Sequence, residues 1–385
     1  MSTSSDISVL DTSQPKCIGI IRLSAIGDSV LATATLQLLE KIGSNAKIYW
    51  FTQTPSSHLI SSAYPKVECI EISKENTNHL KKEIYSQIDL LVDLQNTVRS
   101  SRVVRAFRKI NQTGFITTIE KHNFHRTKMI LKATLFGRSR KATQQTMTAQ
   151  KSQIKRMLET LHQGLQYFPS VYTNPEEQQK VLQALQHARP TLPLQHSTES
   201  WAQELKYGQW LGISLGATHE TKQAPTIVWK NILSRVDQRL CKQNGASHHP
   251  IGLLLLGSAS ERRTSLNFLA SLNWHGPVLP LVGKLNLTQS SQALMHCTLF
   301  LGNDSGLTHI AEALNIPAGV LFGPTVEGFG FAPSQPNSRA FSTEIGCRPC
   351  SRHGQRKCRY QDQLCFHGIS TNQVCEFTLH HLGTQ

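Results

Sequence analysis

One turn of this sequence reads Gly302-Asn303-Asp304-Ser305-Gly306-Leu307-Thr308-His309, directly after the apolar run 299–301. The run predicts a buried parallel strand, and apolar residues at 307, 310 and 314 share one face of a predicted helix. The start of a helix has unpaired N–H groups and the positive end of the dipole, which together bind anions. The turn is therefore either an anion site at a strand end or an ordinary capped turn.

Strands alternate with helical segments on both sides of residue 200. The predicted strands are 17–21, 47–51, 67–72 and 90–94 in the first half, and 211–215, 251–256, 299–301 and 318–322 in the second. The first of them is followed by a predicted helix at 29–41. This alternation indicates an α/β protein with parallel sheets. We expect a disordered tail at 1–15, domains at 16–200 and 201–345, and a cysteine-rich tail at 346–385.

Composition limits the choice of location and partner. The chain has 385 residues and a formal net charge of +15. Its apolar runs are shorter than the ~20 residues of a membrane span, and its start lacks a secretory pattern, so we expect a cytoplasmic protein. The basic residues are spread along the chain without the motif of a nucleic-acid module. We therefore expect phosphorylated ligands or anionic lipid rather than nucleic acid.

The turn after the first strand carries a basic and an acidic residue, Arg22 and Asp28, within Arg22-Leu-Ser-Ala-Ile-Gly-Asp28. It lacks the G-x-G-x-x-G pattern of a dinucleotide site. Asp28 has two interpretations: a helix cap, or a general base that takes a proton from an attacking hydroxyl. In the second, Arg22 holds an anionic acceptor.

Two turns of the second half carry residues suited to a nucleotide. Thr218 and Lys222 follow the strand at 211–215, where a hydroxyl and an ammonium group suit a phosphate. Glu261 follows the strand at 251–256, where it either accepts hydrogen bonds from a ribose or favours a helix start. Because ligands of parallel sheets bind at the carboxyl ends of the strands, we expect these turns to face one site.

These segments together resemble the ADP-heptose:lipopolysaccharide heptosyltransferase family, glycosyltransferase family 9. The resemblance is carried by Arg22–Asp28, Asp93–Ser100, Gly216-Ala-Thr with Lys222 and Pro225, Gly257 with Glu261-Arg262, Leu281–Lys284, Gly302–His309 and Leu321-Phe-Gly-Pro-Thr325. It covers roughly residues 17 to 330, in the order and spacing of the family, and the block from Gly302 is its most specific part.

The resemblance implies a GT-B fold, in which two Rossmann-like domains with parallel sheets face each other across a cleft. It implies that Asp28 is the catalytic base of an inverting transfer of heptose from ADP-heptose to a lipopolysaccharide inner-core acceptor. The implied donor-binding residues are Thr218, Lys222, Glu261, Asp304, Ser305, Gly306 and His309. The resemblance also implies that no cofactor is required. The alternatives are a transferase that uses another nucleotide sugar and a non-catalytic sugar-nucleotide-binding protein.

The middle of the chain is basic. Arg99 and Arg102 lie on a predicted helix, and Arg126 follows further along the chain. We interpret these residues as either a solvated face or the binding site of a lipid-linked anionic saccharide acceptor. The apolar stretch 129–136, flanked by basic residues, is either a core-facing helix or a surface on the cytoplasmic face of the inner membrane.

Four cysteines near the end of the chain have the ligand type of a zinc site. Cys347 and Cys350 are separated by two residues, and Cys358 and Cys365 follow. Four thiolates bind structural zinc. Reduced structural cysteines are the alternative, because disulfides are rare in cytoplasmic proteins.

Overall fold

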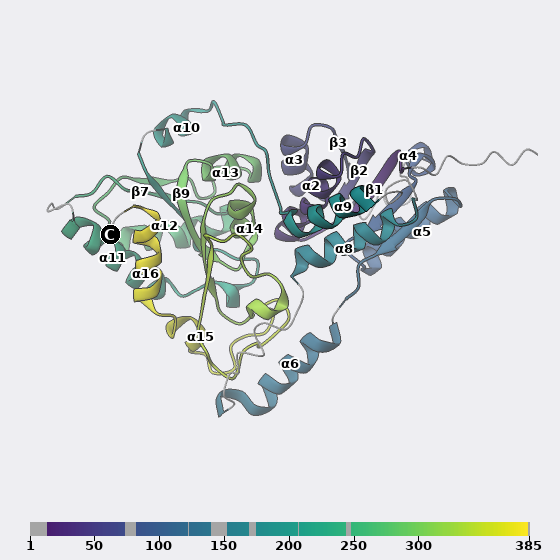
Figure 1. The fold of residues 1–385 in the computed structure, drawn as a ribbon. Coiled ribbons are helices and arrows are strands. Elements are labelled where there is room, and N and C mark those ends of the chain that lie inside the picture. The colour runs from purple at the N-terminus through teal and green to yellow at the C-terminus, as the bar shows by residue number, and fades with distance from the viewer. Residues whose placement is uncertain are drawn as a thin grey trace, which may run out of the picture.

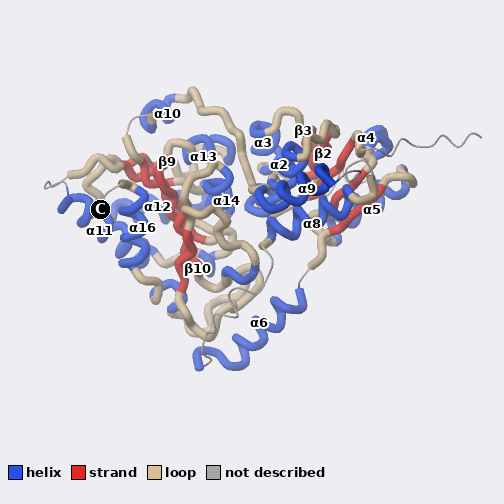
Figure 2. The backbone as a smooth tube through the Cα atoms, in the orientation of Figure 1, coloured by secondary structure: helices blue, strands red, loops and turns tan. Residues whose placement is uncertain are grey.

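The computed structural model describes residues 14–73, 82–121, 123–139, 152–168, 175–206, 208–243 and 248–383. The predicted N-terminal tail, except for its last two residues, lies outside these ranges. Two parallel sheets with helices on their faces form two halves side by side (Figure 1). Figure 2 shows the strands of each half enclosed by helices. The prediction of an α/β protein with two parallel sheets is therefore confirmed.

The sheet of the first half has five parallel strands in the order β3-β2-β1-β4-β5. The strands are β1 (Cys17–Ile21), β2 (Lys47–Thr52), β3 (Val67–Glu71), β4 (Leu90–Asp93) and β5 (Phe115–Thr118). Every residue of the central strand β1 is buried. This matches the continuous apolar run expected of a parallel strand covered on both faces.

Seven helices accompany this sheet among the described residues. They are α1 (Ile26–Ala32), α2 (Ala34–Lys41), α3 (Ser56–Ala63), α4 (Lys82–Gln87), α5 (Val98–Ile110), α8 (Gln153–Leu165) and α9 (Pro175–His187). Helix α6 (Asn123–Phe136) lies apart from the sheet and packs on Phe329 of the second half (Figure 1). The helix predicted at 29–41 starts at Ile26 and is divided at Thr33. Thr33 donates its hydroxyl to the carbonyl of Val30, which competes with the regular helical pattern. The earlier start puts Asp28 inside the first turn of α1.

The sheet of the second half has six parallel strands in the order β11-β10-β9-β6-β7-β8. They are β6 (Trp210–Ser214), β7 (Gly252–Leu255), β8 (Val278–Pro280), β9 (Cys297–Asn303), β10 (Ala318–Phe322) and β11 (Arg339–Ser342). The sequence predicted β6, β7, β9 and β10. It missed the edge strands β5, β8 and β11, which have three or four residues and exposed positions that weaken the apolar pattern.

The helices of the second half include the end of the cysteine-rich tail. They are α10 (Ser200–Leu205), α11 (Thr226–Gln243), α12 (Arg262–Ser271), α13 (Leu287–Leu294), α14 (Gly306–Ala313), α15 (Leu364–His367) and α16 (Thr371–His381). Helix α16 buries Val374, Cys375 and Leu379 in the same apolar cluster as α11. The last helix of the tail therefore shares the core of the second sheet.

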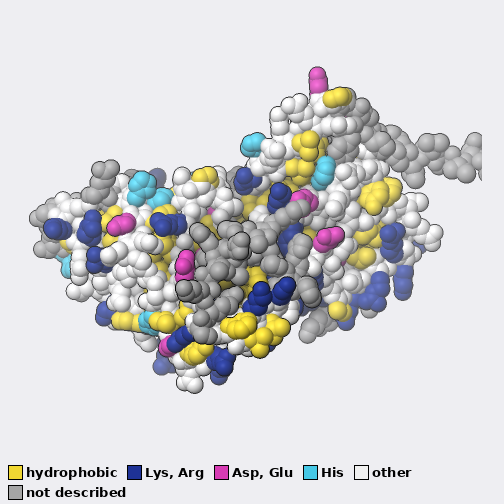
Figure 3. Space-filling view, turned by 60° about the horizontal axis from the view of Figure 1, so that its bottom comes forward, with side chains coloured by type: hydrophobic (Ala, Val, Ile, Leu, Met, Phe, Trp, Pro, Cys, Tyr) yellow, Lys and Arg dark blue, Asp and Glu magenta, His cyan; other side chains and the backbone are white. Residues whose placement is uncertain are grey.

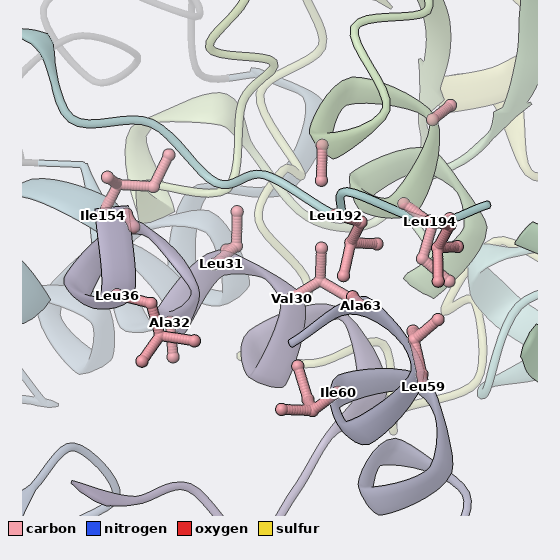
Figure 4. Close-up of a cluster of buried hydrophobic side chains, with 14 of the residues drawn as sticks. Val30, Leu31, Ala32, Leu36, Leu59, Ile60, Ala63, Ile154, Leu192 and Leu194 are labelled. Carbon is pink, nitrogen blue, oxygen red and sulfur yellow. The ribbon is translucent and has the colours of Figure 1, made fainter. Parts of the chain in front are cut away.

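The segment before α10 joins the two halves through apolar contacts. Figure 4 shows Leu192 and Leu194 beside Val30 of α1 and Ala63 of α3. Leu192 also donates its backbone N–H to the carbonyl of Ala313 in α14, at 3.0 Å. One apolar cluster thus runs from the first sheet through this segment into the second half.

Within the described ranges, no helix is both long and apolar enough to cross a membrane.

Replacing Leu192 with Ala is expected to lower the free energy of unfolding by about 2–5 kcal/mol, because it leaves a cavity between the halves. Leu192 is 3% exposed, whereas Leu182 on α9 is 56% exposed. Leu182→Ala is the matched control and should change stability by less than about 0.5 kcal/mol. Urea unfolding of both variants checks this. Equal effects would contradict the packing described for the segment.

Candidate active site between the two sheets

The first turns of α1 and α14 touch at two glycines. A Cβ atom on Gly27 would lie 2.6 Å from the Cδ2 atom of His309, and one on Gly306 would lie 3.2 Å from the Cγ2 atom of Ile26. Helix α1 follows β1 and α14 follows β9, so the contact joins the carboxyl ends of one strand from each sheet. It brings Asp28 to the turn at 302–309.

Asp28 forms an ion pair with Arg22. The Nη2 atom of Arg22 lies 2.7 Å from the Oδ1 atom of Asp28, and Nη1 of Arg22 donates to the carbonyl of Leu94. The Gln95 side chain accepts the N–H of Leu23 at 2.9 Å, which fixes the same turn to the end of β4. Position 25, not Asp28, is the N-cap of α1, so Asp28 does not fill the capping role considered from the sequence.

Two further buried guanidinium groups surround this carboxylate. Burial, and then the charge of Arg156, lower the pKa of Arg126 to about 10, against the opposing effect of Asp28. Burial lowers the pKa of Arg156 as well, and Asp28 again opposes the shift. Arg126 donates to the carbonyl of Phe329 in the second half, at 2.6 Å. The structure thus joins the predicted residues Arg22, Asp28 and Arg126, and adds Arg156 of α8.

Several buried donors of this region have no hydrogen-bond partner among the described residues. They are the Nε atoms of Arg22, Arg126 and Arg156, the hydroxyl of Ser305 and Nδ1 of His309. An unsatisfied buried polar group costs about 1–3 kcal/mol. A bound anionic ligand would supply the missing acceptors, so these atoms fit a binding site better than a closed core.

Lys222 pairs with Asp304 across the ends of β6 and β9. Its Nζ atom lies 2.6 Å from Oδ2 of Asp304, which also accepts the Thr325 hydroxyl at 2.8 Å. The buried amide of Asn303 accepts the N–H of Ala224 at 3.0 Å and donates to the carbonyl of Leu215 at 2.8 Å. These bonds hold the Lys222 segment against the turn at 302–309.

Glu261 lies between the ends of β6 and β7. Its Oε2 atom accepts the N–H of Ser258 at 3.0 Å in a capping box. A Cβ atom on Gly216 would lie 2.1 Å from the Glu261 carboxyl carbon, so this glycine leaves room for the carboxylate. The capping role considered from the sequence is therefore present. Thr218 lies exposed just beyond β6.

The cysteine-rich tail also contributes to this site, which the sequence did not reveal. Gly354 has a φ of +82°, and a Cβ atom there would lie 2.5 Å from Cγ of Lys222. Thr221 donates its hydroxyl to the carbonyl of Gly354. Burial, then the charge of Arg126, lower the pKa of His353, and Asp28 and Lys222 also act on it. His353 therefore lies within electrostatic reach of both halves of the site.

Arg99 and Arg102 lie on exposed turns of α5. Arg99 donates to the side chain of Gln53 at 2.9 Å. Asp28 pairs with Arg22, and its charge acts on Arg126, Arg156 and His353. Arg99 bonds to Gln53 instead, so the structure does not join Arg99 and Arg102 to this group.

The four cysteines of the tail gather in one region. A hydrogen bond from Cys350 lowers the pKa of Cys347, burial opposes this shift, and Arg138 adds to it. The hydrogen bond to Cys347 and burial raise the pKa of Cys350, and the charges of Cys365 and Cys358 add to this. Within the described ranges, no three of these sulfur atoms lie within 4.8 Å of one another.

A family model described as glycosyltransferase family 9 (heptosyltransferase) matches residues 77–361. The chain belongs to this family. The resemblance seen in the sequence is confirmed, and the predicted enzyme class, a glycosyltransferase, is the class of this family. Lipopolysaccharide heptosyltransferase 1 of Pseudomonas aeruginosa is 30% identical over 146 residues. That match spans 38% of this chain and about a third, 36%, of the curated relative.

Solved structures of family members share the fold over almost the whole chain. E. coli ADP-heptose lipopolysaccharide heptosyltransferase II matches with a TM-score of 0.63 and 17% identity, covering 95% of this chain and 98% of that one. The iron-containing dodecameric glycosyltransferase TibC from enterotoxigenic E. coli matches with a TM-score of 0.51 and 12% identity. That match covers 97% of this chain and 77% of TibC. The GT-B fold is confirmed by these likenesses.

Proposed function

We propose that this family 9 protein transfers a heptose from ADP-heptose to an inner-core acceptor of lipopolysaccharide, with inversion at the anomeric carbon. The observation that carries the proposal is the contact of α1 with α14. It places a carboxylate, Asp28, beside the turn at 302–309, to which Lys222 is held through Asp304. A base from one half then faces a diphosphate site in the other.

In the proposed reaction, Asp28 takes the proton of the acceptor hydroxyl while that oxygen attacks the anomeric carbon. The bond from this carbon to the diphosphate oxygen breaks, and the electron pair leaves with the nucleoside diphosphate. Arg22, at 2.7 Å, orients the Asp28 carboxylate for this role. General-base catalysis of this kind contributes about 10²–10⁴-fold to the rate.

The departing diphosphate gains negative charge, and fixed positive groups stabilise it. We assign this role to Lys222 and to the N-terminal amides of α14. His309, whose Nδ1 atom is buried without a partner among the described residues, is a further hydrogen-bonding group at the same turn. Ser305 and Gly306 line the same turn, and Thr218 lies beyond β6. The ion pair with Asp304 holds Lys222 in place until a phosphate oxygen takes over. Glu261 accepts the ribose hydroxyls.

The acceptor of the proposed reaction is anionic and lipid-linked. Arg22, Arg126 and Arg156 present three guanidinium groups around a single carboxylate, and guanidinium groups bind carboxylates and phosphates in pairs of hydrogen bonds. The exposed Arg99 and Arg102 extend the positive surface along α5. A transferase that uses another nucleotide sugar fits the same geometry, whereas a pure sugar-nucleotide binder needs no carboxylate in the opposite half.

Asp28→Asn is expected to lower the transfer rate by about 10²–10⁴-fold and to leave ADP binding unchanged, because the amide cannot take the proton. Transfer assays with ADP-heptose measure the rate, and calorimetry with ADP measures the binding.

Lys222→Ala is expected to weaken ADP binding, because the variant loses the ammonium group that contacts the diphosphate. Lys242→Ala, which changes an exposed lysine of α11, is the matched control. Calorimetry with ADP, UDP and GDP measures the effect. If UDP or GDP is preferred, the sugar donor is different; if no nucleotide binds, the chain is not a transferase.

We propose a second element of the site, a structural metal ion held by Cys347, Cys350, Cys358 and Cys365. The thiols fit as donors because they lie close enough for their charges to act on one another. Their sulfur atoms must approach one another to share a tetrahedral ion such as zinc. TibC is iron-containing, which makes iron the other candidate. The ion would order the loop that supports Lys222, since Gly354 follows Cys350 closely.

Cys347→Ser with Cys350→Ser is expected to remove about one equivalent of zinc or iron from the purified protein and to lower its melting temperature. Cys69→Ser changes a half-buried cysteine of the first half and is the control. Elemental analysis and thermal unfolding measure the outcome. An unchanged metal content would leave these four residues as reduced structural cysteines.

We also propose that α6 rests on the cytoplasmic face of the inner membrane. One side of α6 packs Met129 and Ile130 against Phe329. The other side exposes Leu131 and Leu135 by 56% and 68%, and Phe136 at the end of the helix is 57% exposed. Lys128 and Lys132 are exposed on the same helix, and Figure 3 shows hydrophobic and basic side chains next to one another on this face of the molecule. Apolar side chains mixed with lysines suit an anionic lipid surface.

Leu135→Ser combined with Phe136→Ser is expected to weaken binding to vesicles of phosphatidylcholine with anionic phosphatidylglycerol by more than about tenfold, because each lost CH₂ contact is worth about 0.8 kcal/mol. Leu182→Ser alters an exposed leucine of α9 and is the control. Co-sedimentation at low and high salt measures binding, and salt should weaken it. Equal binding by both variants would refute this placement.

A further inference from the structure

The second half carries a second group of metal-ligand side chains, Asp237, Cys241 and His275. Asp237 and Cys241 are four residues apart on α11, so they lie on the same face of that helix. His275 lies in the loop that leads into β8. One ligand atom from each residue lies within 4.8 Å of the other two.

This group lies at the opposite edge of the sheet from the active site. His275 and the nearby His249 precede β8 and β7, whereas Glu261 and Lys222 follow strand ends. Figure 1 shows α11 at the end of the second half that faces away from the first half. A ligand here would therefore take no part in sugar transfer.

The carboxylate of Asp237 is held from several directions. Its Oδ2 atom lies 2.7 Å from Nδ1 of His275, and its Oδ1 atom accepts the backbone N–H of His275 at 2.7 Å. His249, whose side chain is fully buried, lies with Nε2 at 2.9 Å from the same Oδ1 atom. The Asp237 side chain is 4% exposed. These hydrogen bonds fix the Asp237 carboxylate close to the thiol of Cys241 and the imidazole of His275. The carboxylate is therefore already positioned to act as a metal ligand.

The donor set determines which ion fits. A thiolate, an imidazole nitrogen and a carboxylate oxygen together match zinc and similar transition-metal ions. Calcium and magnesium take oxygen ligands instead. His249 bonded to the other oxygen of Asp237 has the place of an outer-shell group, which orients a ligand and tunes its affinity.

The geometry needs a small adjustment to hold an ion. With zinc–oxygen and zinc–nitrogen bonds near 2.1 Å, tetrahedral ligand atoms lie about 3.4 Å apart. The Asp237 and His275 atoms, now 2.7 Å apart, would have to separate by about 0.7 Å. The His275 side chain is 40% exposed and can move. Its open side leaves room for water, or for His248, whose ring centroid lies 6.2 Å from that of His275.

We propose that Asp237, Cys241 and His275 form a binding site for zinc or a similar divalent transition-metal ion, with a water molecule or His248 as the fourth ligand. The ion ties the end of α11 to the loop that enters β8, and His249 links the loop that enters β7. The role of the ion is structural, because it links α11 to the loops that enter the strands β7 and β8.

The test uses the full chain, freed of metal by a chelator and titrated with Co²⁺, which gives a thiolate charge-transfer band when a cysteine binds it. Because the tail cysteines also bind metal in our proposal, the starting protein carries Cys347→Ser and Cys350→Ser. This starting protein is expected to bind one equivalent of Co²⁺ and to show the charge-transfer band of a single thiolate. Adding Cys241→Ser should abolish both the band and the binding of Co²⁺, whereas adding Cys69→Ser should change neither.

A further variant separates a ligand from its support. His249→Gln is expected to weaken Co²⁺ binding by roughly 10- to 100-fold while the charge-transfer band is retained at saturation, because this residue orients Asp237 without binding the ion. Thermal unfolding of each variant shows that it is folded. The proposal is overturned if the starting protein and its Cys241→Ser derivative bind Co²⁺ to the same extent and with the same affinity.

Discussion

The close approach of α1 to α14 is the constraint on which the rest of the site depends. Gly27 and Gly306 have no side chain, so the first turns of two helices from different sheets touch directly. A methyl group at Gly27 would meet the His309 ring at 2.6 Å and push the halves apart. The segment through Leu192 packs beside the same helices, so the contact belongs to the shared core rather than to a loose interface.

Around this contact the protein buries an excess of positive charge. Arg126 and Arg156 both have a pKa lowered by burial, which shows that the surroundings disfavour their charged forms. Asp28 opposes the shift in each, but one carboxylate cannot balance three guanidinium groups. The unsatisfied donors in this region are the structural counterpart of that imbalance. The excess charge and the unsatisfied donors both fit a site that binds anionic molecules. With little water in such a site, the attraction between the guanidinium groups and a bound anion is strong.

The sequence revealed the parts of the fold and site that depend on neighbouring residues. Strand runs such as 318–322, and the turns holding Asp28 and Asp304, are local patterns, and the helix break at Thr33 was the main local error. Arg156 and His353 were missed because nothing beside them in the chain marks them; they reach the site through tertiary packing. The Asp237 group is similar, because its third member, His275, comes from a distant loop.

The support of Lys222 by Gly354 has a consequence for how the protein is made. A ribosome releases the chain from its N-terminus, so the first sheet and Asp28 emerge long before the loop at 351–354. The second sheet is completed by β11, just before that loop, and its core includes α16, which follows the loop. The first half can therefore fold early, whereas Lys222 gains its support and its sheet gains its full core at nearly the same stage of synthesis.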